Sequence, residues 1–193
     1  MRNKLRNLLL EVAEGRLDVD EAVRSLGNPG YVDLGFARVD IDRAERRGIP
    51  EVIFGEGKES AHIASLMQTI DDNQQQALAT RISSEVAAEV RAHNPQLPVT
   101  YDEAARCLYT SRFPVEKRGQ GTILVVSAGT ADGPVAAEAA LTARLFGNEV
   151  ERLTDVGVAG IHRILSEQNS LRQASVVIVC AGLEGALPSV VAG

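Results

Sequence analysis

Tryptophan is absent from this chain of 193 residues, and aromatic residues make up only 4% of it. Acidic residues outnumber basic ones, which gives a formal net charge of −6 and an isoelectric point near 5.2. Proteins that bind nucleic acids usually present a basic face, and those that bind single strands add aromatic side chains on which bases stack. The composition therefore argues against a nucleic-acid partner and indicates a small-molecule ligand.

Cysteines and long apolar segments are equally scarce. Cys107 and Cys180 are too few for a disulfide framework and lack C-x-x-C spacing. The N-terminus is basic, but its apolar run is only three leucines long before Glu11, so it predicts an amphipathic helix rather than a secretory signal. No segment approaches the ~20 apolar residues of a membrane span. We therefore expect a cytoplasmic protein with no membrane partner.

The first half of the chain alternates between helical and strand patterns. Its composition is that of an ordinary globular protein, since 45% of the whole chain is hydrophobic and 24% is charged. Residues 1–27 predict two short N-terminal helices, which Gly15 and Gly27 end. A turn at 28–30 opens a small α/β unit over residues 28–94. The predicted strands of this unit are 36–41, 51–54 and 78–82, and its predicted helices are 59–70 and 83–93.

Residues 95–120 predict a connector between this unit and the next. They contain three of the seven prolines and the polar stretch 116–120. Within the predicted connector, the pattern over residues 99–109 is compatible with either a strand or a helix.

The pattern sharpens in residues 121–193, which predict a second α/β domain. Residues 122–126 form a continuous apolar run, as expected of a strand buried on both faces. A helix over 134–146 follows, with Pro134 in its first turn and Gly147 at its end. The alternation then continues with a strand over 149–153, a helix over 160–168, an apolar strand over 175–181 and a helix from 184.

Strand–helix alternation of this kind predicts a doubly wound parallel sheet with helices on both faces. Such sheets normally have about five strands, whereas this stretch of sequence predicts three. We therefore expect a sheet that is C-terminally incomplete, with little for the apolar face of Leu187, Val190 and Val191 to cover. The chain would then be a fragment, unless the N-terminal unit or another chain supplies strands.

Three loops of small residues follow the three strands and should meet at one edge of the sheet, where ligands of this architecture bind. The first loop, 127–133, leads into a helix N-terminus, whose free N–H groups favour phosphate or carboxylate. It lacks the third glycine of a G-x-G-x-x-G dinucleotide fingerprint. The other loops are 154–160 and 181–185. Together the loops provide the candidate substrate-binding residues Ser127, Gly129, Thr130, Asp155, Gly157, Val158, Gly160, Gly182 and Gly185.

Each loop also carries one acid, namely Asp132, Asp155 and Glu184. Any one of them alone is compatible with a helix cap that binds nothing, but three acids at one edge favour a ligand site. Which acid transfers a proton stays open. We favour Glu184 as the catalytic residue, because it should lie at the switch point of the sheet, and Asp132 is the second catalytic candidate.

The remaining reactive side chains carry weaker signals. Cys180 ends an apolar strand, where a buried thiol usually has a packing role. His62, His93 and His162 lack metal-ligand spacing, so no dedicated metal site is expected. A cluster of mixed charges before residues 48–50 is typical of a solvated turn, but it could instead clamp a phosphate. Its members are Asp40, Asp42, Arg43, Arg46 and Arg47.

Four motifs resemble the LarB family, whose members begin the synthesis of the nickel-pincer nucleotide cofactor. Three of them are SAGTADGPVAAEA (127–139), TDVGVAGIHRIL (154–165) and CAGLEGALPSVV (180–191). The fourth, RRGIPEVIFGEGK (46–58), resembles the N-terminal region of the family. The resemblance covers about residues 36–193. It implies a C-terminal domain like PurE, the carboxylase of purine synthesis, with a flavodoxin-like sheet and a homo-octameric assembly.

The resemblance further implies a reaction between nicotinic acid adenine dinucleotide and CO2. The enzyme carboxylates C5 of the pyridinium ring and hydrolyses the phosphoanhydride, which gives AMP and pyridinium-3,5-biscarboxylic acid mononucleotide. No tightly bound cofactor is implied, although Mg²⁺ is plausible beside the pyrophosphate. The family uses a cysteine nucleophile, which the resemblance places beyond residue 193, and neither Cys107 nor Cys180 matches its motif. We therefore expect this chain to bind the substrate without completing the chemistry.

Two alternatives stay open. One is PurE-type aminoimidazole ribonucleotide carboxylase, but the proton-transferring histidine of PurE corresponds here to Ala186, and PurE lacks the N-terminal unit. The other is a non-catalytic nucleotide-binding subunit, since a fold alone does not determine function.

Overall fold

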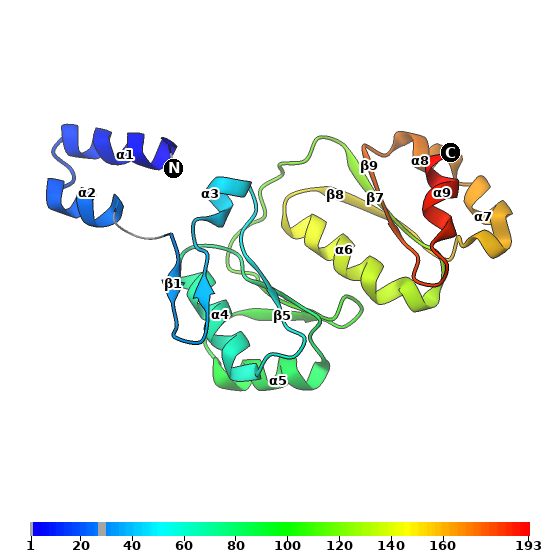
Figure 1. The fold of residues 1–193 in the computed structure, drawn as a ribbon, viewed down its shortest axis with the longest axis horizontal. Helices are drawn as coiled ribbons and strands as arrows, with labels where there is room; N and C mark the ends of the chain where they lie inside the picture. Colours follow the sequence, from blue (N-terminus) through cyan, green and yellow to red (C-terminus); the bar gives the residue numbers. More distant parts are fainter. Residues whose placement is uncertain (1, 27–29) are drawn as a thin grey trace.

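A computed structural model describes residues 2–26 and 30–193. Helices α1 (Arg2–Ala13) and α2 (Val19–Leu26) form a helical hairpin at the N-terminal end of the fold (Figure 1). They agree with the two helices that the sequence predicts. Gly15 follows α1 with a positive φ of 70°, a backbone conformation that favours glycine. The predicted helix stop at Gly27 and the first two residues of the predicted turn, 28 and 29, lie outside the described residues.

The next unit is built on a sheet of mixed direction. Its strands are β3 (Val52–Phe54), β4 (Leu78–Thr80), β5 (Val99–Asp102) and β6 (Cys107–Thr110), in the order β3-β4-β6-β5. Only the β3–β4 pair is parallel. Helices α4 (Ser60–Asp72) and α5 (Ser84–His93) contribute to the core on one face of this sheet, where Ile63, Met67 and Val90 are buried.

The strand predicted at 36–41 is largely wrong. The structure has a small hairpin instead, with β1 (Val32–Asp33) and β2 (Arg38–Val39), followed by the short helix α3 (Arg43–Arg47). Gly35, directly before the predicted strand, has a positive φ of 81° and takes part in the turn of the hairpin. Beyond β2, the N–H of Asp40 donates to the Glu51 side chain rather than to a strand.

The boundaries of the predicted connector are also wrong, because residues 99–110 belong to the first sheet. Strands β5 and β6 form a hairpin, and the prolines and the polar stretch 116–120 that predict a connector flank this hairpin rather than lie within it. The Asp102 carboxylate accepts a hydrogen bond from the N–H of Ala105 at 2.9 Å and closes the turn. The Tyr101 hydroxyl donates to the Ile82 carbonyl at 2.9 Å and anchors the hairpin. The link between the two sheets is therefore residues 111–121.

The second sheet confirms the predicted doubly wound parallel arrangement. Its strands β7 (Thr122–Ser127), β8 (Glu149–Leu153) and β9 (Val176–Cys180) have the order β8-β7-β9 and are all parallel. Helix α6 (Gly133–Leu145) covers one face. The other face packs against the segment that contains α7 (Ile161–Leu165), α8 (Gln168–Gln173) and α9 (Ala186–Ala192). The single helix predicted over 160–168 is thus interrupted between α7 and α8.

Two packing expectations for this sheet need correction. Strand β9 is not buried throughout, because it lies at the edge of the sheet, and Val176 is 50% exposed. The apolar face of α9 has a core to cover, because Leu187 is 1% exposed and packs in a cluster with Leu124, Val126 and Ile164.

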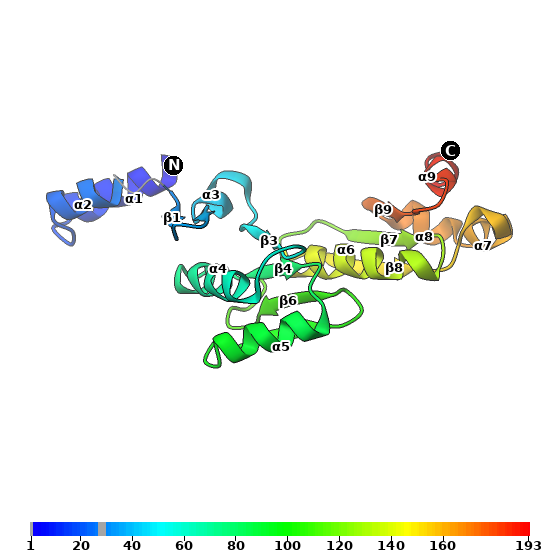
Figure 2. The ribbon, with the colours of Figure 1, turned by 60° about the horizontal axis from the view of Figure 1, so that its bottom comes forward.

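Helix α6 joins the two sheets. Its residues Ala136 and Ala140 pack on the second sheet, while Ala137 and Leu141 pack against Leu78 and other residues of the first sheet. The result is a stack with α4 and α5 on one outer side and α9 on the other (Figure 2). None of the helices in residues 2–26 and 30–193 is long and apolar enough to cross a membrane.

The packing around α6 predicts a specific stability effect. Leu78 is 1% exposed, so Leu78→Ala should leave a cavity between the first sheet and α6 and lower the free energy of unfolding by about 2–5 kcal/mol. Leu183 is 97% exposed, so the matched control Leu183→Ala should change it by less than about 0.5 kcal/mol. Urea denaturation measures both. Equal midpoints for the two variants would contradict the packing described.

Candidate functional site

A cleft of about 1130 Å³ opens where the three parallel strands of the second sheet end. The loops after β7, β8 and β9 line it, and it contains most of the residues that the sequence nominated. The nominated residues on its wall are Gly129, Thr130, Asp132, Asp155, Gly157, Val158, Gly182, Glu184 and Gly185. Ser127 and Gly160 are not on the wall: Ser127 is buried at the end of β7, and Gly160 lies beneath Arg163.

Backbone hydrogen bonds of Ala128 tie the first loop to both of its neighbours. The N–H of Ala128 donates to the Cys180 carbonyl at 3.0 Å, and its carbonyl accepts from the N–H of Gly157 at 2.8 Å. A Cβ atom at position 157 would lie 2.8 Å from the Ala128 carbonyl oxygen, so the approach of these two loops requires glycine. The small residues of the motif therefore bring the loop backbones close to one another.

Asp132 forms a second link between loops. One carboxylate oxygen accepts from the N–H of Gly129 at 2.9 Å, and the other accepts from the N–H of Gly182 at 2.8 Å. Because strand β7 lies between β8 and β9, the second of these bonds spans the switch point of the sheet. With both oxygens engaged by backbone donors, Asp132 is better suited to positioning the loops than to transferring a proton.

Asp155 is also paired. Its carboxylate lies 2.7 Å from the Arg163 guanidinium, which reaches back from α7 toward the Gly157 carbonyl at 3.5 Å. Asp155 has a positive φ of 59°, a conformation that aspartate tolerates better than most residues. Arg163 is the basic side chain on the cleft wall, and the sequence reasoning missed it. Its spacing of three residues after Gly160, at the start of a helix, is the signal that could have identified it.

Glu184 differs from the other two acids. Its side chain is exposed on the cleft wall and has no hydrogen-bond or ion-pair partner within the described part of the chain. Gly185 follows with a positive φ of 67° and turns the chain into α9. Among the three acids, Glu184 is therefore the one whose carboxylate is available to a ligand.

Both cysteines are buried. Burial, with the Glu138 and Asp102 carboxylates nearby, raises the pKa of the Cys107 thiol to about 12. Burial and the Asp132 carboxylate also raise the pKa of Cys180. A thiol acts as a nucleophile in its thiolate form, so neither cysteine is suited to nucleophilic chemistry as folded.

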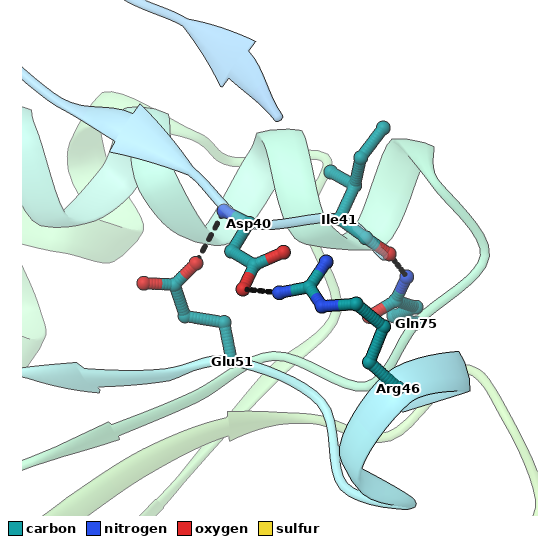
Figure 3. A network of polar contacts seen from close by, with 5 residues as sticks. All are labelled: Asp40, Ile41, Arg46, Glu51 and Gln75. Carbon is teal, nitrogen blue, oxygen red and sulfur yellow. Dashed lines mark hydrogen bonds and ion pairs between the residues drawn. The ribbon is translucent and has the colours of Figure 1, made fainter. Parts of the chain in front are cut away.

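Two members of the charged cluster after β2, Asp40 and Arg46, take part in a network of polar contacts (Figure 3). The Arg46 guanidinium lies 2.5 Å from the Asp40 carboxylate, and Glu51 accepts from the N–H of Asp40. The Gln75 amide donates to the Ile41 carbonyl at 2.5 Å, which ties this segment to the turn before β4. Within residues 2–26 and 30–193, no group of three or more His, Cys, Asp or Glu side chains is placed to hold a metal ion.

A three-stranded parallel sheet with helices on both faces and a cleft at its strand ends defines the doubly wound class of α/β proteins. Comparison with known sequences narrows this class. Residues 31–112 match the LarB/PurE-like N-terminal domain. The whole chain aligns over 198 residues, at 34% identity, with uncharacterized protein MJ0165 of Methanocaldococcus jannaschii, and the alignment covers 77% of that protein. The chain belongs to the LarB family, and its LarB/PurE-like domain indicates a carboxylase-related function.

The two hydrogen bonds that the Asp132 carboxylate accepts predict that this residue stabilises the loops rather than transfers a proton. Asp132→Asn keeps one acceptor but turns an amide N–H₂ toward a backbone donor, so the free energy of unfolding should fall by about 1–3 kcal/mol. The matched control Glu184→Gln changes an unpaired acid and should alter it by less than about 0.5 kcal/mol. Chemical denaturation, with the amide NMR signals of Gly129 and Gly182 as local probes, checks both. Unchanged signals and stability in Asp132→Asn would contradict the link between loops.

Burial of the thiols predicts slow chemical labelling. At pH 8 the native chain should react with a thiol reagent far more slowly than the same chain in denaturant, since both thiols are protonated and covered. Leu183→Cys places a thiol at a fully exposed position and serves as the positive control. Native labelling of Cys107 or Cys180 at the rate of the control would show that the thiol is accessible.

Proposed function

We propose that the protein acts on nicotinic acid adenine dinucleotide in the first step of nickel-pincer nucleotide cofactor synthesis. The reaction adds CO2 to C5 of the pyridinium ring and hydrolyses the phosphoanhydride. The products are AMP and pyridinium-3,5-biscarboxylic acid mononucleotide, with a proton released from C5. The observation that carries this proposal is the cleft at the strand ends, found in a chain of the LarB family.

The size and lining of the cleft support a dinucleotide ligand. Its volume of about 1130 Å³ slightly exceeds the range of roughly 300–1,000 Å³ that is usual for small-molecule sites, so an extended ligand has room. The loops on its wall are rich in glycine and alanine, which lets a pyrophosphate approach the backbone. The guanidinium of Arg163 adds a positive charge at the same wall, and guanidinium geometry suits phosphate oxygens.

The loop residues have distinct proposed roles. Arg163 binds the pyrophosphate, and Asp155 orients the guanidinium through their 2.7 Å contact. Asp132 and Ala128 hold the three loops in register. Glu184, whose carboxylate is unpaired within the described residues, accepts the proton that leaves C5.

The ring chemistry requires a nucleophile before CO2 can add. A pyridinium carbon is electron-poor and does not attack CO2. Addition of a thiolate at C4 breaks the aromatic system and makes C5 an enamine carbon, which attacks CO2; loss of the C5 proton then expels the thiolate and restores the ring. Cys107 and Cys180 are buried with raised pKa values, so we assign the thiolate to neither.

In this proposal a metal ion such as Mg²⁺ is bound to the pyrophosphate of the substrate and not held by a dedicated site of the protein. The described residues bring together no set of three or more metal-ligating side chains. The proposed assembly, a homo-octamer like that of PurE, likewise rests on family likeness alone.

The test separates binding from chemistry. The chain is incubated with nicotinic acid adenine dinucleotide, Mg²⁺ and carbon-13 bicarbonate, and mass spectrometry follows AMP and the labelled dicarboxylate mononucleotide. Calorimetry on the same samples measures binding. Saturable binding together with both products supports the proposal. Binding without either product is the result expected if the nucleophile comes from outside residues 1–193, and it equally fits a non-catalytic nucleotide-binding subunit. Repeating the test on a chain extended past Gly193 separates these two. The absence of binding contradicts both.

The proposed roles predict different effects for two variants. Arg163→Ala should weaken dinucleotide binding about tenfold or more, because a charge-assisted contact to the pyrophosphate is lost. Glu184→Gln should leave binding within about twofold of the parent and lower only the rate of product formation. Arg144→Ala, at an exposed position near the end of α6, is the matched control for removal of a positive charge. Equal losses in Arg163→Ala and Arg144→Ala would contradict a specific role for Arg163.

A further inference from the structure

A second cleft lies in the N-terminal unit, apart from the three loops. It has a volume of about 250 Å³ and is formed between the turn of the β1–β2 hairpin and the start of α4. Its wall brings together an aromatic ring, a basic side chain and an acidic side chain from Phe36, Lys58 and Glu59. None of these residues takes part in the function proposed above.

The aromatic part of this cleft is preorganised. The rings of Phe36 and His62 are stacked, with centroids 4.0 Å apart and an angle of 17° between their planes. The turn that presents Phe36 is held by two short-range bonds: Gly35 N–H donates to Asp33 at 2.8 Å, and Leu34 N–H donates to the Ala37 carbonyl at 2.9 Å. Phe36 is nevertheless 45% exposed, so a large apolar ring is fixed in place while part of its surface stays open.

The charged part of the cleft is unpaired. Neither the Lys58 ammonium nor the Glu59 carboxylate forms an ion pair or side-chain hydrogen bond within residues 2–26 and 30–193. An ammonium group attracts a phosphate, and a carboxylate accepts hydrogen bonds from an amine. A ligand that pairs with the whole wall therefore combines a planar ring, a hydrogen-bond donor such as an amino group, and an anionic group such as a phosphate.

We propose that this cleft binds an adenylate group, with the adenine stacked on Phe36, its exocyclic amine donating to Glu59 and its phosphate paired with Lys58. The volume of about 250 Å³ is below the usual range of roughly 300–1,000 Å³, so it suits one nucleotide unit rather than a dinucleotide. The site does not depend on the reaction proposed for the strand-end cleft. Free AMP and the adenylate half of a larger nucleotide share this chemistry, and the test distinguishes them.

Calorimetric titration of the whole chain with AMP tests the proposal. Phe36→Leu keeps an apolar side chain but removes the stacking ring, and Lys58→Gln removes the charge; each should weaken AMP binding about tenfold. Phe54→Leu is the matched control, because Phe54 is also exposed on this unit but is not on the cleft wall. Inosine monophosphate has a carbonyl in place of the exocyclic amine, so it should bind more weakly than AMP. Glu59→Gln should abolish this preference for AMP, because the amide of glutamine can donate a hydrogen bond to that carbonyl as well as accept one from the amine.

Two further titrations separate this site from the strand-end cleft. In one, nicotinic acid adenine dinucleotide replaces AMP as the ligand. In the other, AMP is titrated into Arg163→Ala. We expect AMP binding to persist in Arg163→Ala and to fall in Phe36→Leu and Lys58→Gln. If the dinucleotide alone shows the Phe36 and Lys58 dependence, the adenylate source is the larger nucleotide. The proposal is overturned if Phe36→Leu and Lys58→Gln weaken the binding of neither AMP nor the dinucleotide. It is also overturned if AMP binding is lost only in Arg163→Ala. That last case would leave the function proposed for the strand-end cleft intact.

Discussion

Ala128 donates its N–H to the Cys180 carbonyl and accepts from the N–H of Gly157, so the loop after β7 is bonded to the end of β9 on one side and to the loop after β8 on the other. Asp132 extends this connection by accepting from both Gly129 and Gly182. The cleft exists because these contacts hold three separate loops at one edge of the sheet. A Cβ atom at position 157 would lie 2.8 Å from the Ala128 carbonyl oxygen, so replacement of Gly157 by a larger residue would push these two loops apart.

The position of this edge depends in turn on α6. The helix begins directly after the loop that carries Asp132, and it is packed between the two sheets of the protein. The ion pair between Arg81 and Glu138, at 3.0 Å, reinforces the contact from the first sheet. A helix fixed on two sides gives the first loop a rigid support, which is what a binding site on loops requires. The N-terminal unit thus supports the site through packing without lining it.

Much of this arrangement could be predicted from the sequence because strong periodic patterns report on burial. The apolar runs of β7 and β9 and the small-residue loops after them placed the cleft correctly. Strands β5 and β6 were assigned to a connector because prolines and the polar stretch 116–120 flank them, and the pairing of β6 with both β5 and β4 shows only in the fold. The engagement of Asp132 could not be predicted either, since its partner Gly182 is 50 residues away. Arg163 becomes part of the site only because α7 directs it back toward Asp155.

The central claim is that the edge held together by Ala128 and Asp132 binds nicotinic acid adenine dinucleotide. A crystal structure of the chain with this dinucleotide tests it most directly. The account predicts the pyrophosphate in the cleft between the three loops, within hydrogen-bond distance of Arg163, with the bonds from Gly129 and Gly182 to Asp132 unbroken. A dinucleotide bound outside this cleft, or one whose phosphates displace Asp132 from those glycines, would contradict the account.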